Sequence, residues 1–141
     1  MSERLDQLAA YFESINEVTV PRLRGFYAPD AYFKDPFNEV RDVAAIEHIF
    51  AQMYVSLHDP RFVIQSKVEQ GDEAFLTWDF NFRIKRYKPA VTRTIRGSSH
   101  LKFDAGNRVC YHRDYWDAAE ELYEKLPLVG ALMRFLKKRV G

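Results

Sequence analysis

The chain has 141 residues, of which 47 % are hydrophobic and 15 % are aromatic, and its formal net charge is +1 at pH 7. This length predicts a single domain, residues 1–141, large enough to bury a core rich in aromatic rings, and the interspersed charges argue against a nucleic-acid-binding face. The one cysteine, Cys110, excludes an internal disulfide bond and favours a cytoplasmic location, and no apolar run approaches the roughly 18 residues of a membrane span.

Three helices are predicted in the first half of the chain. After Ser2, a good N-cap, apolar side chains recur at helical spacing and predict a helix over 2–18, with a stripe of Leu5, Leu8, Tyr11, Phe12 and Ile15. A short helix is expected over 21–27, because proline is favoured at an early helical position. Asp42 is expected to cap a third helix that ends near Leu57.

The other segments alternate polar and apolar residues, which predicts strands. A short strand is expected over 31–35, and a helix is expected from about Ala118. Four longer strands are expected over 62–68, 75–86, 92–103 and 108–116. The second of these alternates most clearly and places on one face Leu76, Trp78, Phe80, Phe82 and Ile84. This order of elements predicts an α+β fold with helices on one face of a curved, mainly antiparallel sheet.

The Asp35-Pro36 pair is the first candidate for chemistry. Ala31, Phe33 and Asp35 share one face of the predicted strand, because strand side chains alternate, and that face is otherwise apolar. A carboxylate there costs several kcal/mol unless it is paired, hydrogen-bonded or protonated. Asp35 is therefore either a proton-transfer group or a turn former, since Asp-Pro pairs also begin turns.

A second polar set lies on the last predicted strand. His112, Asp114 and Trp116 share a face with Cys110, and this apolar company favours an inward direction, although a solvated face is the alternative. A histidine beside a carboxylate forms a proton-transfer pair. Two carboxylates in one apolar cavity would push their pKa values apart and provide an acid and a base.

The sequence contains no pattern typical of a metal or cofactor site. No HxH or HExxH spacing joins His48, His58, His100 and His112, and neither a glycine-rich phosphate loop nor a Gly-x-Ser-x-Gly motif is present. We therefore expect no metal and no cofactor.

The element order and the segment 31–37, followed by the helix that contains 44–50, resemble the cone-shaped nuclear transport factor 2-like superfamily. Within it, the chain is most similar to the ketosteroid isomerase and SnoaL-like cyclase group over about residues 5–117. The resemblance implies a strongly curved sheet with N-terminal helices on its concave face, a C-terminal helical extension over 118–141, and a homodimer.

The resemblance also implies roles for individual residues. Asp35 falls at the position of the isomerase general base, and Tyr11 at that of the tyrosine that donates to the substrate oxygen. Ser99 occupies the position of the second donor to that oxygen, where isomerases have a protonated acid. Phe50 stands where a supporting tyrosine is found.

These positions predict a cofactor-free acid–base enzyme that acts on a small hydrophobic carbonyl compound. Asp35, Tyr11, His112 and Asp114 are its expected catalytic residues. The expected substrate-binding residues are Phe33, Phe50, Trp78, Phe80, Phe82, Ser99, Leu101 and Trp116. One alternative is a non-catalytic ligand-binding or dimerisation module. Another is water addition to an epoxide, which would need an Asp-Arg-Asp cluster that includes Arg93, Arg96 or Arg113.

The last residues of the chain form an amphipathic pattern. Apolar residues recur in steps of three and four, and basic residues gather at the end of 126–141. This pattern predicts a helix that packs over the mouth of the cone or across a dimer contact. The alternative is a weak contact of 126–141 with an anionic membrane surface.

Overall fold

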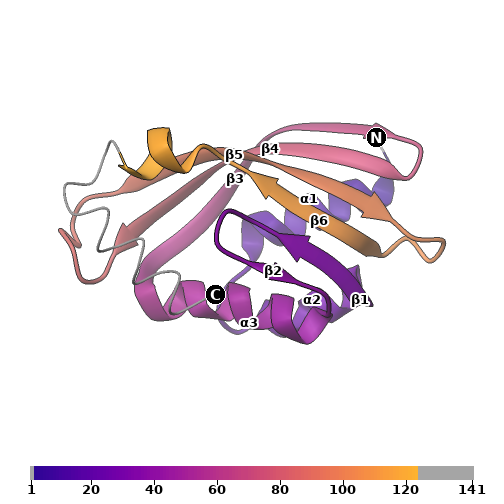
Figure 1. The fold of residues 1–141 in the computed structure, drawn as a ribbon, viewed down its shortest axis with the longest axis horizontal. Helices are drawn as coiled ribbons and strands as arrows, with labels where there is room; N and C mark the ends of the chain where they lie inside the picture. The colour runs from indigo at the N-terminus through magenta and orange to yellow at the C-terminus, as the bar shows by residue number, and fades with distance from the viewer. Residues whose placement is uncertain (1, 124–141) are drawn as a thin grey trace.

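The computed structural model describes residues 2–123, which fold into an α+β arrangement (Figure 1). The helices of the first half are α1 (Glu3–Ser14), the 3₁₀ turn η1 (Val20–Arg22), α2 (Leu23–Phe26) and α3 (Val43–Ser56). The strands are β1 (Tyr27–Lys34), β2 (Glu39–Val40), β3 (Leu57–Gln70), β4 (Glu73–Ile84), β5 (Arg93–Phe103) and β6 (Val109–Tyr115), followed by the π-helical turn η2 (Ala119–Tyr123).

The strands form one six-stranded sheet in the order β2-β1-β6-β5-β4-β3. Only β1 and β6 pair in parallel, and the other neighbours are antiparallel. Helix α1 contacts β3, and α3 contacts both β1 and β3, so the helices cover one face of the curved sheet in Figure 1. The predicted fold class is confirmed for the described residues.

The first helix ends earlier than the sequence predicts, at Ser14 rather than near Val18. The side chain of Asn16 accepts hydrogen bonds from the backbone N–H groups of Val18 and Thr19, at 2.9 and 3.1 Å. Asparagine commonly forms this kind of local turn in place of a helical turn. The chain therefore reverses at 15–19 before η1 begins.

The strand predicted over 62–68 is longer than expected and spans Leu57–Gln70 as β3. A proline such as Pro60 usually marks the end of a helix or strand, because it cannot donate a backbone hydrogen bond. Here β3 is an edge strand, where a proline can be accommodated without the loss of a ladder hydrogen bond. The ladder with β4 is irregular between His58 and Arg61, which accommodates the proline. Asp42 caps α3 as predicted, by accepting a hydrogen bond of 2.7 Å from the N–H of Ala45.

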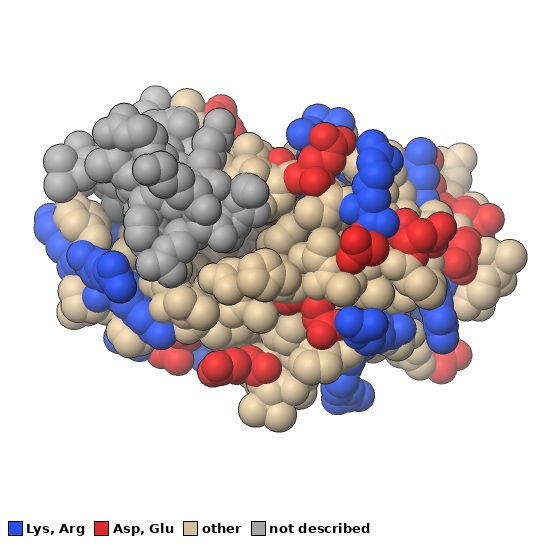
Figure 2. Space-filling view, turned by 60° about the horizontal axis from the view of Figure 1, so that its bottom comes forward, with Lys and Arg blue, Asp and Glu red and all other residues tan. Residues whose placement is uncertain are grey.

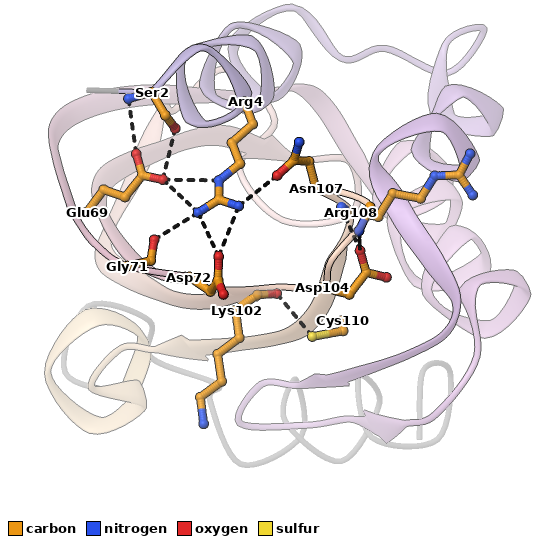
Figure 3. A network of polar contacts seen from close by, with 11 residues as sticks. Ser2, Arg4, Glu69, Gly71, Asp72, Lys102, Asp104, Asn107, Arg108 and Cys110 are labelled. Atoms are coloured by element: carbon orange, nitrogen blue, oxygen red, sulfur yellow. Dashed lines mark hydrogen bonds and ion pairs between the residues drawn. The ribbon is translucent and has the colours of Figure 1, made fainter.

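A cluster of polar contacts centred on Arg4 joins the start of α1 to two turns of the sheet (Figure 3). The guanidinium donates to Glu69 at 3.1 Å, to the carbonyl of Gly71 at 2.8 Å and to Asn107 at 2.9 Å. It also lies 4.2 Å from the ring centroid of Phe103. These contacts hold α1 against the β3–β4 and β5–β6 turns, which fixes the position of the helix over the sheet.

Acidic and basic side chains are interspersed on the face shown in Figure 2, in keeping with the small net charge. The C-terminal helix predicted from about Ala118 begins in the described residues as η2, and the rest of it, with the predicted membrane contact of 126–141, lies outside them. Among residues 2–123, no helix is long and apolar enough to cross a membrane.

Candidate functional site

The register of three neighbouring strands brings the candidate polar residues together. Parallel pairing of β1 with β6 sets Phe33 opposite His112 and Lys34 opposite Arg113. The next residue along the chain is Asp35 on one side and Asp114 on the other, and the charge of Asp114 is near enough to raise the pKa of Asp35. Antiparallel pairing of β6 with β5 then sets Asp114 opposite Ser99.

A chain of hydrogen bonds runs through this part of the sheet. The indole N–H of Trp78 donates to the hydroxyl of Ser99 at 2.9 Å, and that hydroxyl donates to Oδ1 of Asp114 at 2.5 Å. The same Oδ1 lies 2.6 Å from Nε2 of His112, whose Nδ1 lies 2.6 Å from the hydroxyl of Tyr27. Four elements thereby support one carboxylate.

The acceptor character of the Asp114 carboxylate fixes the direction of these bonds. A carboxylate accepts hydrogen bonds, so Nε2 of His112 donates to Asp114, and in the tautomer with its hydrogen on Nε2 the Nδ1 atom accepts from the hydroxyl of Tyr27. Burial raises the pKa of that hydroxyl well above its usual value, and the negative charge of Asp114 raises it further, so the Tyr27 proton is present to be donated. Asp114 Oδ1 thus accepts hydrogen bonds from both His112 and Ser99.

His112 faces the core, which settles the direction of the β6 side chains. It is 2 % exposed and lies edge-on to Phe33, with ring centroids 4.8 Å apart. The side chain of Asp114 is 15 % exposed, so the carboxylate end of the chain is the one that approaches solvent. The predicted inward face of 108–116 is confirmed.

Asp35 combines the two roles that the sequence left open. Its Oδ1 accepts hydrogen bonds from the backbone N–H groups of Phe37 and Asn38, at 2.8 and 2.7 Å, which forms a turn just after β1. The side-chain amide of Asn38 also donates to both carboxylate oxygens, at 3.1 and 3.2 Å.

Burial nevertheless raises the pKa of Asp35 above its ordinary value. The backbone N–H groups of Phe37 and Asn38 oppose this effect, and the negative charge of Asp114 adds to it. Asp35 is therefore a stronger base than an exposed aspartate, and its Oδ2 is the oxygen with fewer hydrogen bonds to the protein.

The environment of Tyr11 differs from the one that the resemblance implies. Its hydroxyl donates to the backbone carbonyls of Thr19 and Val20, at 2.8 and 3.2 Å, and burial raises the pKa of Tyr11 to about 12. A phenol has one proton to donate, and here that proton is already engaged. The tyrosine that joins the polar chain is Tyr27 instead.

The expected lining residues lie on the same face of the sheet and on α3. Those that are buried are Phe33, Phe50, Trp78, Phe82, Ser99 and Leu101. Phe80 and Trp116 are partly buried, and Trp116 lies edge-on to Phe37 with ring centroids 5.5 Å apart. The hydroxyl of Ser99 donates to Asp114, so it is not free to donate to a substrate oxygen in this arrangement.

Sequence analysis missed Tyr27 and Asn38 as members of the site. The sequence placed Tyr27 at the end of a predicted helix. Pro29 interrupts the strand pattern, and β1 pairs irregularly with β6 between Tyr27 and Tyr32, so the first half of β1 was not recognised as strand. Asn38 could have been found, since an aspartate commonly accepts hydrogen bonds from the N–H groups two and three residues further on.

A family model described as the SnoaL-like domain matches residues 8–112, which include Tyr27, Trp78, Ser99 and His112 of the hydrogen-bonded chain and end two residues before Asp114. The chain belongs to this family. No curated protein matches it.

Three solved structures illustrate the fold of this SnoaL-like chain. A candidate SnoaL-like polyketide cyclase from Shewanella putrefaciens is 20 % identical, with 89 % of this chain and 99 % of that chain covered and a TM-score of 0.70. A candidate polyketide cyclase from Acidithiobacillus ferrooxidans is 24 % identical, with 90 % and 94 % covered and a TM-score of 0.68. A hypothetical protein from Catenulispora acidiphila, solved with trimethylamine and described as having a ketosteroid isomerase-like fold, is 16 % identical, with 87 % and 92 % covered and a TM-score of 0.71.

Proposed function

We propose that this SnoaL-like protein is a cofactor-free acid–base enzyme that acts on a small hydrophobic carbonyl compound. The observation that supports this most directly is the state of Asp35, a half-buried carboxylate whose pKa is raised by desolvation and by the negative charge of Asp114. A carboxylate with a raised pKa is suited to take a proton from the carbon next to a carbonyl group and to return it elsewhere.

Asp35 acts as the base in this proposal, through Oδ2. Asp114 accepts hydrogen bonds from Ser99 and His112 through its Oδ1, and its negative charge helps to raise the pKa of Asp35. His112 and Tyr27 continue the chain inward and hold the Asp114 carboxylate in place. Asp35 then returns the proton that it took to another carbon of the substrate, while Asp114, held by His112, orients a water molecule or the substrate beside it.

The carbonyl oxygen of the substrate needs a hydrogen-bond donor as negative charge develops on it. Trp116 offers one, because no hydrogen bond joins its indole N–H to another described residue. Its half-buried ring packs against Phe37 in the segment that follows Asp35. We assign the donor role to Trp116, since the hydroxyls of Tyr11 and Ser99 are engaged.

The aromatic surroundings support a hydrophobic ring-containing substrate. Phe62, Phe80 and Phe82 form a row of ring contacts along the sheet, with centroids 4.6 and 5.3 Å apart. The description of two structural neighbours as candidate polyketide cyclases is in keeping with this class of substrate.

The substitution Asp35→Asn tests the proposal. The probe is 2-tetralone, a small aromatic ketone with acidic hydrogens at C1, and the measurement is the exchange of those hydrogens for deuterium by NMR. Positioned acid–base groups contribute about 10²–10⁴-fold in rate, so the protein-catalysed exchange should fall by roughly that factor in Asp35→Asn.

The matched control is Asp30→Asn, which removes an exposed carboxylate from the same strand, β1. It should exchange 2-tetralone at the wild-type rate. An Asp35→Asn protein that folds normally and retains wild-type exchange would remove Asp35 from the chemistry.

A non-catalytic ligand-binding protein is the second candidate, and the engaged hydroxyls of Tyr11 and Ser99 favour it. It predicts that 2-tetralone binds without any acceleration of exchange. The epoxide alternative has less support: Arg96 is paired with Glu120 and Glu121, and the guanidinium of Arg113 lies over the ring of Tyr115.

A further inference from the structure

The side chain of Asn38 contains a buried hydrogen-bond acceptor without a partner. Asn38 is 7 % exposed, and its Oδ1 makes no hydrogen bond within residues 2–123. A buried amide oxygen that is left without a donor costs about 1–3 kcal/mol, so such groups are rare in folded proteins and call for an explanation.

The orientation of this amide is fixed by its neighbour. The Nδ2 of Asn38 lies 3.1 and 3.2 Å from the two oxygens of Asp35, and an ionised carboxylate can only accept hydrogen bonds. The nitrogen must therefore face Asp35, and the oxygen bonded to the same carbon must face the other way. Exchanging the two atoms would set two acceptors against each other.

The backbone leaves Asn38 little freedom to satisfy the oxygen by moving. The N–H of Asn38 donates to Asp35 at 2.7 Å, and its carbonyl accepts from the N–H of Asp35 at 3.0 Å. The backbone and the side-chain amide of Asn38 thus make four hydrogen bonds with the same aspartate, which hold Oδ1 in a fixed position near the proposed base.

We propose that Oδ1 of Asn38 accepts a hydrogen bond from a hydroxyl group of the substrate, next to the carbon that Asp35 deprotonates. This inference rests on the proposed function, because it concerns the same site. It narrows the substrate from a hydrophobic carbonyl compound to one with a phenolic or enolic hydroxyl beside its acidic carbon. A cationic donor would pair with the carboxylates of Asp35 and Asp114 instead, whereas a neutral hydroxyl suits a neutral amide oxygen.

Two ketones that differ in one group test the proposal. In 8-hydroxy-2-tetralone the hydroxyl lies next to C1, the acidic carbon, and in 8-methyl-2-tetralone a methyl group of similar size takes its place. Isothermal titration should show that the wild-type protein binds the hydroxyl compound about tenfold more tightly, which is the effect of one hydrogen bond to a buried acceptor.

Variants of Asn38 separate the oxygen from the nitrogen. In Asn38→Leu both are lost, and the two ketones should bind equally. In Asn38→Asp an acceptor oxygen is kept while the donor to Asp35 is lost, so the preference for the hydroxyl compound should persist. Equal binding of the two ketones by the wild type, a preference that survives Asn38→Leu, or a preference that disappears in Asn38→Asp would each overturn the proposal.

A measurement on the wild-type chain covers the case in which Asn38→Leu does not fold. The side-chain amide resonances of Asn38 should shift on addition of the hydroxyl compound and stay in place with the methyl compound. Identical responses would overturn the assignment. Asp35→Asn separates this inference from the proposed function, because it should lose exchange at C1 but keep the binding preference.

Discussion

At the scale of single residues, Asp35 shows how one side chain can be both structural and reactive. Oδ1 ends β1 by accepting N–H groups of the following turn, which leaves Oδ2 with a single contact, to the amide of Asn38. The sequence presented these two roles as alternatives, because an Asp-Pro pair predicts a turn and an apolar strand face predicts a buried acid. The structure accommodates both, since each oxygen can serve a different purpose.

Asp35 should also make stability depend on pH in a specific direction. Its folded-state pKa is raised above 3.8, so the folded protein holds this proton more tightly than the unfolded chain. Stability is therefore lost as pH rises from about the unfolded pKa through the folded pKa. Asp35→Asn removes this loss, and the variant should gain in stability relative to wild type over that pH range.

Urea denaturation of both proteins between pH 3 and pH 7 measures this effect. The difference in free energy of unfolding between Asp35→Asn and wild type should grow in favour of the variant as pH rises, and then level off. A difference that is constant with pH would show that the carboxylate has an ordinary pKa in the folded protein.

The sequence assigned His112 and Asp114 to the interior because they share strand parity with Cys110 and Trp116, and His112 is indeed buried. The parity with Cys110 fails, however, because the pairing of β5 with β6 shifts register there and Val109, not Cys110, is the buried residue. Asn38 could have been assigned from the local turn that follows Asp35, but Tyr27 could not, because it lies in the irregular part of β1. The position of Tyr27 depends on the parallel pairing of β1 and β6, which joins segments that are far apart in the chain. The pattern of polar and apolar residues does not indicate which strands pair with each other.

At the scale of elements, β4 and β5 contribute Trp78 and Ser99, which support the site through hydrogen bonds. The alternation of β4 was evident in the sequence, and Trp78 indeed faces the core. Opposite it stands Gly97, where a Cβ would come within 2.5 Å of the Trp78 ring. The glycine makes room for an indole that donates to Ser99, and this contact could not be inferred from parity alone.

Gly97→Ala should disturb the site by displacing Trp78, which donates a hydrogen bond to Ser99. The added methyl group must displace the buried Trp78 ring, and overpacking of this kind costs about 1–3 kcal/mol in the free energy of unfolding. Displacement also breaks the bond from Trp78 to Ser99, so the exchange of 2-tetralone should slow. Chemical denaturation and the exchange assay measure the two effects.

Gly25→Ala is the matched control for Gly97→Ala, because, apart from its chain neighbours and the backbone of its own helix, no atom of the described residues lies within 4 Å of the position that its Cβ would occupy. It should leave stability and exchange almost unchanged. If both alanine variants behave like wild type, the close approach of Trp78 to Gly97 does not constrain the site.

At the scale of the whole molecule, the order of helices and strands was enough to predict the α+β class and the curved sheet. The lengths of elements were predicted less well where local chemistry overrides periodicity, as at Asn16 after α1 and at Pro60 in β3. The homodimer stays a prediction from the resemblance.

Arg4 holds α1 against the sheet, so Arg4→Met should weaken the fold as a whole. The side chains of Arg4 and Glu69 are only 17 % and 10 % exposed, and the substitution leaves Glu69 without its cation. We expect a loss of about 2 kcal/mol in the free energy of unfolding, measured by urea denaturation.

Arg24→Met is the control for Arg4→Met, because Arg24 pairs with Glu47 at a more exposed position, where such pairs contribute about 0–1 kcal/mol. Equal losses in the two variants would mean that the Arg4 cluster contributes no more than an ordinary surface pair.

The most direct test of a buried basic carboxylate at residue 35 is the rate of deuterium exchange at C1 of 2-tetralone as a function of pH, measured for wild type and Asp35→Asn. The wild-type rate should rise with pH through a pKa above 3.8 and exceed that of the variant by about 10²–10⁴-fold at its plateau. Superimposable profiles for the two proteins would contradict the assignment of Asp35 as the base.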